Sequence, residues 1–283
     1  MTVADALRRA EQRLRAAGVS QPALDAETLL RHALGCDRAA VIARRGDTLS
    51  AAEEKGFLAL VEQRASRRPL QHLTGTQAFW RHDFVVSPAV LVPRPETELL
   101  VEAALRAMRG LTAPVVVDAG TGSGCIALSL AAERPDAALH ATDVSPAALE
   151  VARDNARRLG LDGRVAWHEG DLLAPVAHLR GAVHLVVSNP PYVHPADLPG
   201  LAPEVRDHEP RPALLAPDPP YGIYERLARQ SRDLLRPGGH LLVEVGAGMA
   251  EQVAQKLDAA GLPPTETRRD LAGIPRVVAS RRP

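Results

Sequence analysis

A short polar motif, Asn189-Pro190-Pro191-Tyr192, directly follows the apolar run Val183–Val187. The side-chain oxygen of Asn189 and the backbone carbonyl of Pro190 are adjacent acceptors that suit the N–H bonds of a planar –NH2 group. Pro191 fixes its own φ and biases Pro190 toward an extended backbone, which sets the direction of these acceptors in advance. The Tyr192 ring offers a face for stacking on a planar group. Such a site would serve group transfer to nitrogen by orientation and electrostatics, without a strong general base.

A glycine-rich run follows the β-branched segment Val115–Ala119 and opens a helical pattern; it reads Gly120-Thr121-Gly122-Ser123-Gly124. Glycines in the first strand-to-helix turn of a nucleotide-binding sheet let the backbone approach a ligand and adopt positive φ. The spacing G-x-G-x-G differs from the dinucleotide fingerprint, and no Gly-Lys-Ser/Thr follows, which excludes a P-loop. The alternative interpretation is a tight structural turn.

Acidic residues stand where such a ligand would need them. Asp118 precedes the first glycine by two residues and would bind a cationic amino group, whereas Asp143 ends the next strand and would accept hydrogen bonds from ribose hydroxyls. A ligand with a ribose, an ammonium group and no phosphate describes S-adenosylmethionine. Asp171 and Leu172 follow the third strand, where the carboxylate would face the adenine amine and the leucine the ring; the alternative for Asp171 is a solvent-facing turn.

The elements that position these residues alternate from Pro114 onward, which predicts βαβ units and a doubly wound, mostly parallel sheet of the Rossmann-like α/β class. Ligands of such sheets bind beyond the carboxyl ends of the strands. Strands are expected over 115–119, 138–142, 165–168, 183–188, 240–245 and 276–280, and helices over 125–133, 146–159, 221–235 and 249–260. Pro237-Gly238-Gly239 is expected to form a turn, and the proline-rich segment 190–220 a functional loop.

The N-terminal part has a different pattern. Helices are expected over 3–17, over 22–34 and from Ser50, which forms a predicted capping box with Glu53, to a point before Pro69. Residues 74–92 resemble a β-hairpin with its turn at His82-Asp83. These patterns predict a helical domain over 1–73, a hairpin linker over 74–92 and a catalytic domain over 93–283. The helical domain is either a docking domain for a partner or an accessory domain with solvated charges.

Composition excludes several classes of protein. The 283 residues carry 34 basic and 34 acidic side chains, so a general nucleic-acid coat is disfavoured. Hydrophobic residues at 46% and charged residues at 24% argue against global disorder. The two cysteines make no disulfide framework, no metal spacing is present, and no apolar run is long enough to span a membrane. We therefore expect a soluble protein of a reducing compartment, the cytoplasm, with no bound metal. Cys125 is expected to be a small residue at a helix start, and His168, His178 and His184 to be structural.

With these motifs in order, the sequence resembles the protein-(glutamine-N5) methyltransferases that modify peptide-chain release factors, a class I S-adenosylmethionine-dependent family. Besides Asn189–Tyr192, the resemblance rests on Pro69–Gly75 followed by Phe79-Trp80, on Val90–Glu98, and on His208-Glu209-Pro210 with Ala213-Leu214. These flanking motifs are more specific than Asn-Pro-Pro-Tyr, which adenine and guanine amino-group methyltransferases share.

The resemblance implies that the substrate is the glutamine of the Gly-Gly-Gln loop of class I release factors, whose methylation tunes translation termination. It implies that Gly120 to Gly124, Asp143, Leu172 and Asn189 contact the cofactor, and that Asn189–Tyr192 hold the glutamine amide. Arg94 would line the substrate cleft or pin the linker. Leu172 stands where some members carry an aromatic residue.

Three alternatives remain open at this stage. A related enzyme that methylates a glutamine of a ribosomal protein would share much of the chain. An amino-group methyltransferase of nucleic acids would need a basic surface, which the neutral charge balance disfavours. A cofactor-binding protein without enzyme activity would not need Asn189 and its rigid proline neighbours. We expect neither a membrane partner nor a direct nucleic-acid substrate.

Overall fold

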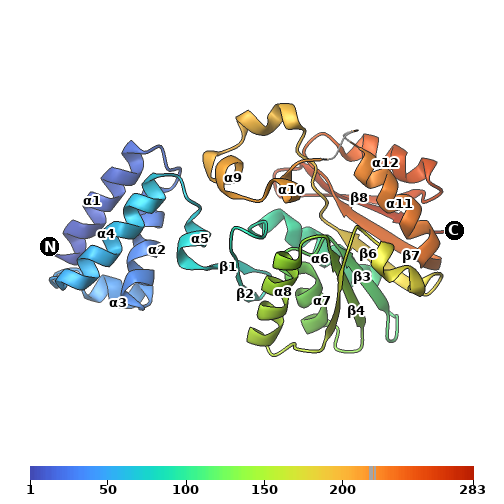
Figure 1. Cartoon of the computed structure of the whole chain (residues 1–283), viewed down its shortest axis with the longest axis horizontal. Helices are drawn as coiled ribbons and strands as arrows, with labels where there is room; N and C mark the ends of the chain where they lie inside the picture. Colours follow the sequence, from blue (N-terminus) through green and yellow to red (C-terminus); the bar gives the residue numbers. More distant parts are fainter. Residues whose placement is uncertain (217–218, 220) are drawn as a thin grey trace. The chain divides into compact units, whose positions relative to one another are not determined.

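The computed structural model describes residues 1–216, 219 and 221–283, which divide into two compact units (Figure 1). One unit comprises Met1–Thr76 together with Ala202–His208, and the other comprises Gln77–Leu201 and Glu209–Pro283. The segment predicted as a functional loop over 190–220 therefore contributes to both units, and its residues 217, 218 and 220 lie outside the described residues.

The first unit is helical. On α1, the apolar residues Val3, Ala6, Ala10 and Leu14 recur at helical spacing and are buried. Ser50 accepts from the amide of Glu53 and donates its own amide to the Glu53 carboxylate, so the predicted capping box forms. The helices are α1 (Val3–Ala16), α2 (Pro22–Leu34), α3 (Arg38–Ala43), α4 (Ala51–Ala65), α5 (Leu70–Thr74) and, from the later segment, α9 (Pro203–His208).

A buried ion-pair cluster joins α9 to the other helices of this unit. Arg64 on α4 donates from Nε to Asp25 on α2 at 2.7 Å and from Nη2 to Glu204 on α9 at 2.8 Å. Arg67 donates to both carboxylate oxygens of Glu204, at 2.8 and 2.6 Å. Burial alone would raise the pKa of Glu204, but the hydrogen bonds from Arg67 and Arg64 lower it to about 2. The carboxylate of Glu204 is therefore ionised and held by two guanidinium groups.

The second unit is built on a seven-stranded sheet in the order β5-β4-β3-β6-β7-β9-β8. The first five strands of this order are parallel, and β9 runs antiparallel to both β7 and β8. This arrangement confirms the predicted mostly parallel, doubly wound sheet. The strands are β3 (Val115–Ala119), β4 (Ala138–Asp143), β5 (Val165–Glu169), β6 (Val183–Ser188), β7 (Leu235–Glu244), β8 (Pro264–Arg269) and β9 (Pro275–Arg281).

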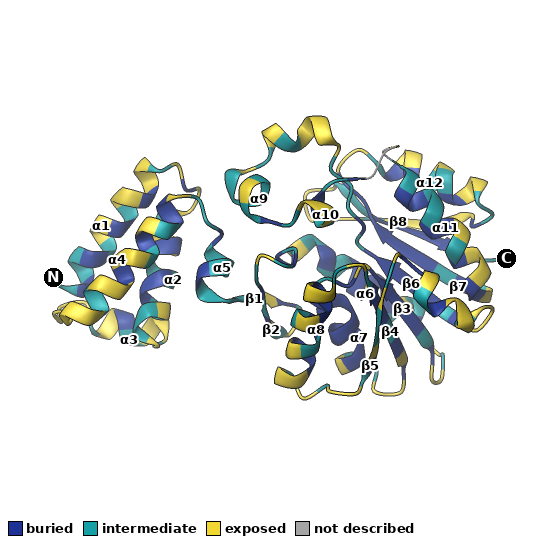
Figure 2. Ribbon diagram, in the orientation of Figure 1, coloured by how far each residue is buried: buried dark blue, intermediate teal, exposed yellow. Residues whose placement is uncertain are grey.

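Helices cover both faces of this sheet. Val116 of β3 packs in a core with α6 (Glu98–Ala107), α7 (Cys125–Glu133) and α8 (Pro146–Arg158). Val117, the next residue, packs in a second core with α11 (Gly222–Leu234), α12 (Ala250–Ala259) and the 3-10 helix η2 (Ala174–Leu179). This alternation of one strand between two cores is the period-two pattern of a sheet buried on both faces. Figure 2 shows the central strands β3, β6 and β7 largely buried and the outer sides of the helices exposed.

The β-hairpin forms, but its predicted turn is wrong. Strands β1 (Thr76–Phe79) and β2 (His82–Val85) flank a turn at Trp80-Arg81 rather than at His82-Asp83. Trp80 adopts a positive φ of 56° while its backbone amide donates to Glu98 and its indole Nε1 to Glu133. These contacts with α6 and α7 hold a bulky residue in the turn, which local turn preferences do not predict.

The predicted turn at Pro237-Gly238-Gly239 is also wrong, because β7 runs through these residues with an irregular register against β6. A Cβ on Gly239 would lie 3.0 Å from the carbonyl oxygen of Arg236 and 3.1 Å from that of Val183. The glycine thus permits a close approach of two backbones within the sheet instead of ending a strand.

Candidate active site

The glycine loop leaves the carboxyl end of β3 with Gly120, Gly122 and Gly124 all at positive φ. The amides of Gly120 and Thr121 both donate to the carbonyl of Thr142 on β4, at 2.9 and 3.0 Å. These bonds bind the loop to the neighbouring strand, so its backbone is fixed before any ligand enters. A side chain on Gly124 would also crowd Ala152 and Leu128 at 3.1 Å.

Asp143 continues this support from the end of β4. Its Oδ2 accepts from the amide of Gly122 at 2.8 Å and its Oδ1 from the amide of Ser145 at 2.9 Å. The Ser145 hydroxyl caps α8 by accepting from Ala148. Because each carboxylate oxygen has more than one lone pair, Asp143 can still accept hydrogen bonds from a ligand.

Asp118 lies beneath the loop and does not line the cavity of about 420 Å³ that the loop borders. It is fully buried, and its Oδ2 accepts from the Thr121 hydroxyl at 2.6 Å and from the amide of Ala127 at 3.2 Å. Burial raises the pKa of Asp118 to about 7 despite these hydrogen bonds, which lower it. Within the described residues, its Oδ1 has no hydrogen-bond partner. Asp118 therefore supports Thr121 and the start of α7 from below.

Asp171 and Leu172 follow β5, as predicted, and both line the cavity. Asp171 forms an ion pair with Arg226 of α11. Leu172 takes a positive φ of 47°, and its carbonyl accepts from the buried hydroxyl of Thr142 at 2.6 Å. This bond fixes an unusual backbone conformation and, with it, the position of the leucine side chain in the cavity wall.

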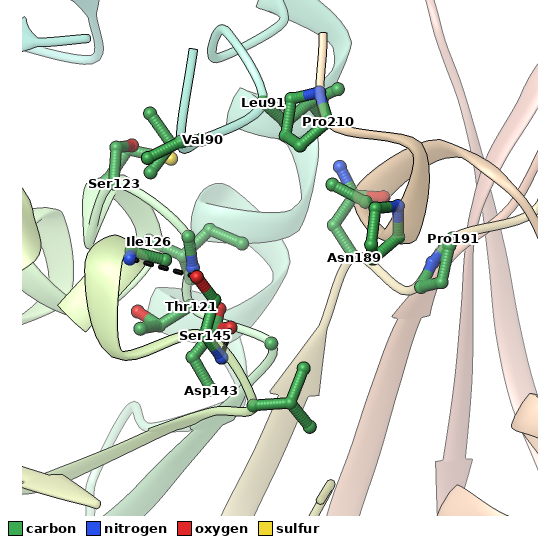
Figure 3. A pocket seen from close by; sticks show the side chains of 18 of the residues that line it. Val90, Leu91, Thr121, Ser123, Ile126, Asp143, Ser145, Asn189, Pro191 and Pro210 are labelled. Atoms are coloured by element: carbon green, nitrogen blue, oxygen red, sulfur yellow. Dashed lines mark hydrogen bonds between the residues drawn. The ribbon is translucent and has the colours of Figure 1, made fainter. Parts of the chain in front are cut away.

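Asn189 follows β6 directly, and β6 lies beside β3 with Ala119 paired to Ser188. Its Nδ2 donates to the Thr97 hydroxyl at 3.2 Å, at the end of the 3-10 helix η1 (Pro95–Thr97). Figure 3 shows Asn189 and Pro191 across the cavity from Thr121 and Asp143. The carboxyl ends of β4, β3 and β6, which are adjacent in the sheet, thus supply residues on two sides of one cavity.

Pro190 and Tyr192 lie outside this cavity. Tyr192 lines an adjacent cavity of about 460 Å³ together with Tyr221, Gly246 and Met249. A Cβ on Gly246 would stand 3.0 Å from the Tyr192 ring, so the absence of a side chain there admits the tyrosine. Burial raises the pKa of the Tyr192 hydroxyl.

Arg94 lines the site and also holds a neighbouring segment. Its Nη2 lies 2.7 Å from both carboxylate oxygens of the buried Glu209. Pro210 and Pro212, which follow Glu209, line the same cavity near α10 (Arg211–Leu214). Arg94 therefore both lines this cavity and holds the segment that begins at Glu209.

These residues surround a cavity of about 420 Å³, within the range of small-molecule sites. Its two lining arginines, Arg94 and Arg226, are each paired with a carboxylate, so neither is free for a phosphate group. The sequence-predicted residues that line it are Arg94, Gly120, Thr121, Gly122, Ser123, Asp143, Asp171, Leu172, Asn189 and Pro191; those that do not are Asp118, Gly124, Pro190 and Tyr192.

The described part of the chain contains neither a metal-binding cluster nor a membrane-spanning helix. No group of three His, Cys, Asp or Glu side chains there could hold a metal ion. His140 and His168 stack with ring centroids 5.3 Å apart, and burial lowers the pKa of both imidazoles. Burial also raises the pKa of the Cys125 thiol to about 12. No helix of the described residues has the length and apolar character needed to cross a bilayer.

Similarity to known proteins extends over almost the whole sequence. Residues 5–75 match the model of the PrmC N-terminal domain, and residues 95–200 match that of the methyltransferase small domain. The release factor glutamine methyltransferase of Cereibacter sphaeroides is 43% identical over 100% of this chain and 99% of its own. That of Moorella thermoacetica is 45% identical over 92% of this chain and 91% of its own.

The chain belongs to the release factor glutamine methyltransferase family. As a member of this family it is a methyltransferase, and its two units correspond to the kinds of domain that the two models describe. A methyltransferase from Pyrococcus furiosus has the same fold over 77% of this chain and 98% of its own, at 16% identity and a TM-score of 0.51.

Sequence reasoning missed several residues of this family member's site. Thr97 and Glu209 are buried and contact Asn189 and Arg94, and Arg226 reaches Asp171 from α11. Val90, Leu91, Val144, Ile126 and the prolines 210 and 212 form apolar cavity walls. Val90, Leu91 and Thr97 lie in the family-like segment Val90–Glu98, and Glu209 and Pro210 in the segment that begins at His208, so a sequence signal was available for them. Arg226 lies on an ordinary amphipathic helix and carries no such signal.

Proposed function

We propose that the enzyme transfers the methyl group of S-adenosylmethionine to the side-chain amide nitrogen of the glutamine in the Gly-Gly-Gln motif of class I release factors. The observation that carries this proposal is the near full-length similarity to release factor glutamine methyltransferases, combined with Asn189 at the cavity edge. Release factors would be the protein partner, and the helical segment 1–73 their docking domain, with 74–92 as linker and 93–283 as catalytic domain.

The cavity fits a cofactor that has a cationic sulfonium and no phosphate. It offers the carboxylates of Asp143 and Asp171, the glycine-loop backbone and apolar walls, and its arginines are already neutralised. We assign Asp143 to the ribose hydroxyls, Asp171 and Leu172 to the adenine, and Gly120–Gly124 to close backbone contact, with Asp118 supporting the loop. When bound, the cofactor would supply an electrophilic methyl group: its carbon–sulfur bond would break as the carbon–nitrogen bond forms, S-adenosylhomocysteine would leave, and the methylated amide would release one N–H proton to solvent.

The chain's own residues would orient the acceptor. The oxygens of Asn189 and Pro190 accept the two N–H bonds of the glutamine amide, so its nitrogen faces the methyl group along the line of transfer. Pro191 fixes the carbonyl direction, Tyr192 contacts the planar amide, and Arg94 lines the approach. Because the fixed acceptors also stabilise positive charge that develops on nitrogen, they contribute electrostatically as well.

The proposal is tested by following labelled methyl transfer from S-adenosylmethionine to a purified class I release factor. A release factor whose motif glutamine is replaced by alanine is the matched control, beside a ribosomal protein and a nucleic acid. We expect label in the first acceptor and none in the alanine variant. Label that persists in the variant, or that appears preferentially in the ribosomal protein or the nucleic acid, would overturn the proposal.

A further inference from the structure

A buried carboxylate that no step above uses lies next to Asn189. Glu244 is the last residue of β7 and is 2% exposed. Burial raises the pKa of Glu244 to about 7, although the hydrogen bonds from the Thr97 and Asn189 side chains lower it. Within the described residues, its Oε2 has no hydrogen-bond partner. Burying a carboxylate is costly, so its presence in the core calls for a local reason.

Sheet register places Glu244 beside the motif. Ser188 of β6 pairs with Val243 of β7, so the residues that follow, Asn189 and Glu244, leave two parallel strands at the same level. The Tyr224 hydroxyl donates to the backbone carbonyl of Glu244 at 3.1 Å and fixes this strand end. A cation close by is already engaged, since Arg276 donates from Nε to Asp270 at 2.8 Å.

Thr97 connects the two residues. It is 2% exposed, and its Oγ1 accepts from Nδ2 of Asn189 at 3.2 Å. A hydroxyl has one proton, so while Thr97 accepts from Asn189 it can donate to the carboxylate of Glu244. The Asn189 –NH2 group is thus directed at both Thr97 and Glu244, and the Thr97 hydroxyl at Glu244.

The direction of these hydrogen bonds decides which end of the Asn189 side-chain amide faces the substrate. The oxygen and nitrogen of an asparagine amide are nearly equal in size, so only hydrogen bonds distinguish the two orientations. With the –NH2 end directed at Thr97 and Glu244, the oxygen is left for the acceptor. A rotation of the amide by half a turn would set its –NH2 end against the –NH2 group of a substrate.

We propose that Glu244 is a positioning residue that, directly and through Thr97, holds the Asn189 side-chain oxygen toward the –NH2 group to be methylated. This inference rests on one part of the proposed function, namely that the Asn189 oxygen accepts a hydrogen bond from the –NH2 group to be methylated. It applies equally whether the substrate is a release factor, a ribosomal protein or a nucleic acid. Its test therefore uses whichever of these three acceptors the wild-type enzyme labels, and its failure is distinguishable from that of the glutamine assignment.

Double-mutant cycles test this chain of contacts. We measure kcat for Glu244→Gln and for Thr97→Val, each alone and in an Asn189→Ala background. If the two residues act through Asn189, each single variant loses ~10-fold or more in kcat, but in the Asn189→Ala background the same substitution changes kcat by less than ~2-fold. An equal loss of kcat in the wild-type and Asn189→Ala backgrounds, or no loss of kcat in the single variants, would overturn the proposal.

Two further variants separate positioning from a structural role. Thr97→Ser keeps the hydroxyl and is expected to retain kcat within ~3-fold, whereas Thr97→Val is not. Glu266→Gln removes a carboxylate from β8 of the same sheet and should leave kcat unchanged. Unfolding curves and cofactor binding will reveal whether Glu244→Gln folds. If it does not, the cycle of Thr97→Val with Asn189→Ala, compared with Thr97→Ser, tests the proposal on its own. Equal activity of Thr97→Ser and Thr97→Val would contradict the inference.

Discussion

Arg94 is joined to Glu209 by an Nη2 that lies 2.7 Å from both carboxylate oxygens, although 115 residues separate them in sequence. The Glu209 side chain is 2% exposed and Arg94 is 31% exposed. Burial raises the pKa of Glu209, and the charge and hydrogen bond of Arg94 oppose that rise. The ion pair therefore keeps the segment that carries the cavity prolines attached to the residues before α6.

Replacing Arg94 by alanine is expected to cost about 1–3 kcal/mol of folding free energy, because it leaves a buried charged acceptor without its partner. The KM for the protein substrate should rise as residues 209–215 lose their anchor. Urea unfolding and steady-state kinetics measure the two effects. Adding Glu209→Gln to Arg94→Ala should recover part of the stability, since a buried amide costs less than a buried carboxylate. A further loss of folding stability in the double variant would contradict this account.

Asn189→Ala is expected to reduce turnover by about 10²-fold or more, the scale of losing one positioned polar group. The folded structure should persist, because the Asn189 side chain is only partly buried at the cavity wall, where it hydrogen-bonds to Thr97 and Glu244. Single-turnover methyl transfer at saturating cofactor measures the effect. Undiminished activity would reject the role assigned to this residue.

Asp143→Ala is expected to weaken S-adenosylmethionine binding, since it removes both the proposed ribose acceptor and the support of the Gly122 amide. A loss of about 10-fold or more in affinity matches one charge-assisted hydrogen bond of roughly 1.5–3 kcal/mol. The matched control is Ser145→Ala, which removes the cap of α8 and should cost ~0.5–2 kcal/mol of stability with little effect on affinity. Calorimetric titration compares the two variants; equal affinities would contradict the assignment.

Arg64→Ala is expected to destabilise the helical unit by about 3–5 kcal/mol, because it leaves Asp25 and Glu204 in a buried cluster without their shared guanidinium. Arg13→Ala is the control, since it breaks an exposed pair with Glu62 in the same unit and should cost ~0–1 kcal/mol. Urea denaturation followed by circular dichroism compares them. Similar midpoints for the two variants would show that the cluster contributes no more than a surface pair.

The pH dependence of stability should contain a contribution from Glu204. Its pKa is about 2 in the folded protein against an ordinary value of 4.5. A depressed folded pKa stabilises the protein above 4.5, and this stabilisation is lost as pH falls from 4.5 toward 2. Glu204→Gln should therefore be less stable than the wild type at pH 7, with a difference that shrinks as the medium is acidified. A constant difference across this window would reject the linkage.

Local sequence signals predicted much of the fold. The predicted capping box at Ser50 begins α4, and α2 spans residues 22–34 as predicted, with Pro22 in its first turn and Gly35 in the αL conformation after it. The βαβ order likewise led to the sheet, because its strands are apolar, short and separated by periodic helices. The short helices α3 and α5 escaped prediction, since five or six residues are too few to show a period.

Features that depend on distant partners could not be predicted in this way. Strand β8 is exposed along most of its length and shows no apolar pattern, because only its pairing with β9 defines it. Glu244 reads as one more charged residue at a strand end until the register of β6 and β7 places it beside Asn189. The glycine loop, Asp143 and Asn189, by contrast, follow predicted strands directly, so chain order alone indicated that they share an edge.

The discontinuity of the helical unit has a consequence for synthesis of the chain. Domains usually fold in the order in which they leave the ribosome. Here Arg64 and Arg67 emerge long before Glu204, and by then β3 to β6 of the sheet have already been made. The nascent N-terminal helices therefore lack Glu204, the carboxylate partner of Arg67 and the second carboxylate partner of Arg64, until more than two thirds of the protein exists. Translation of this enzyme, itself proposed to act on the machinery that ends translation, must run well into its catalytic domain before its first domain is complete.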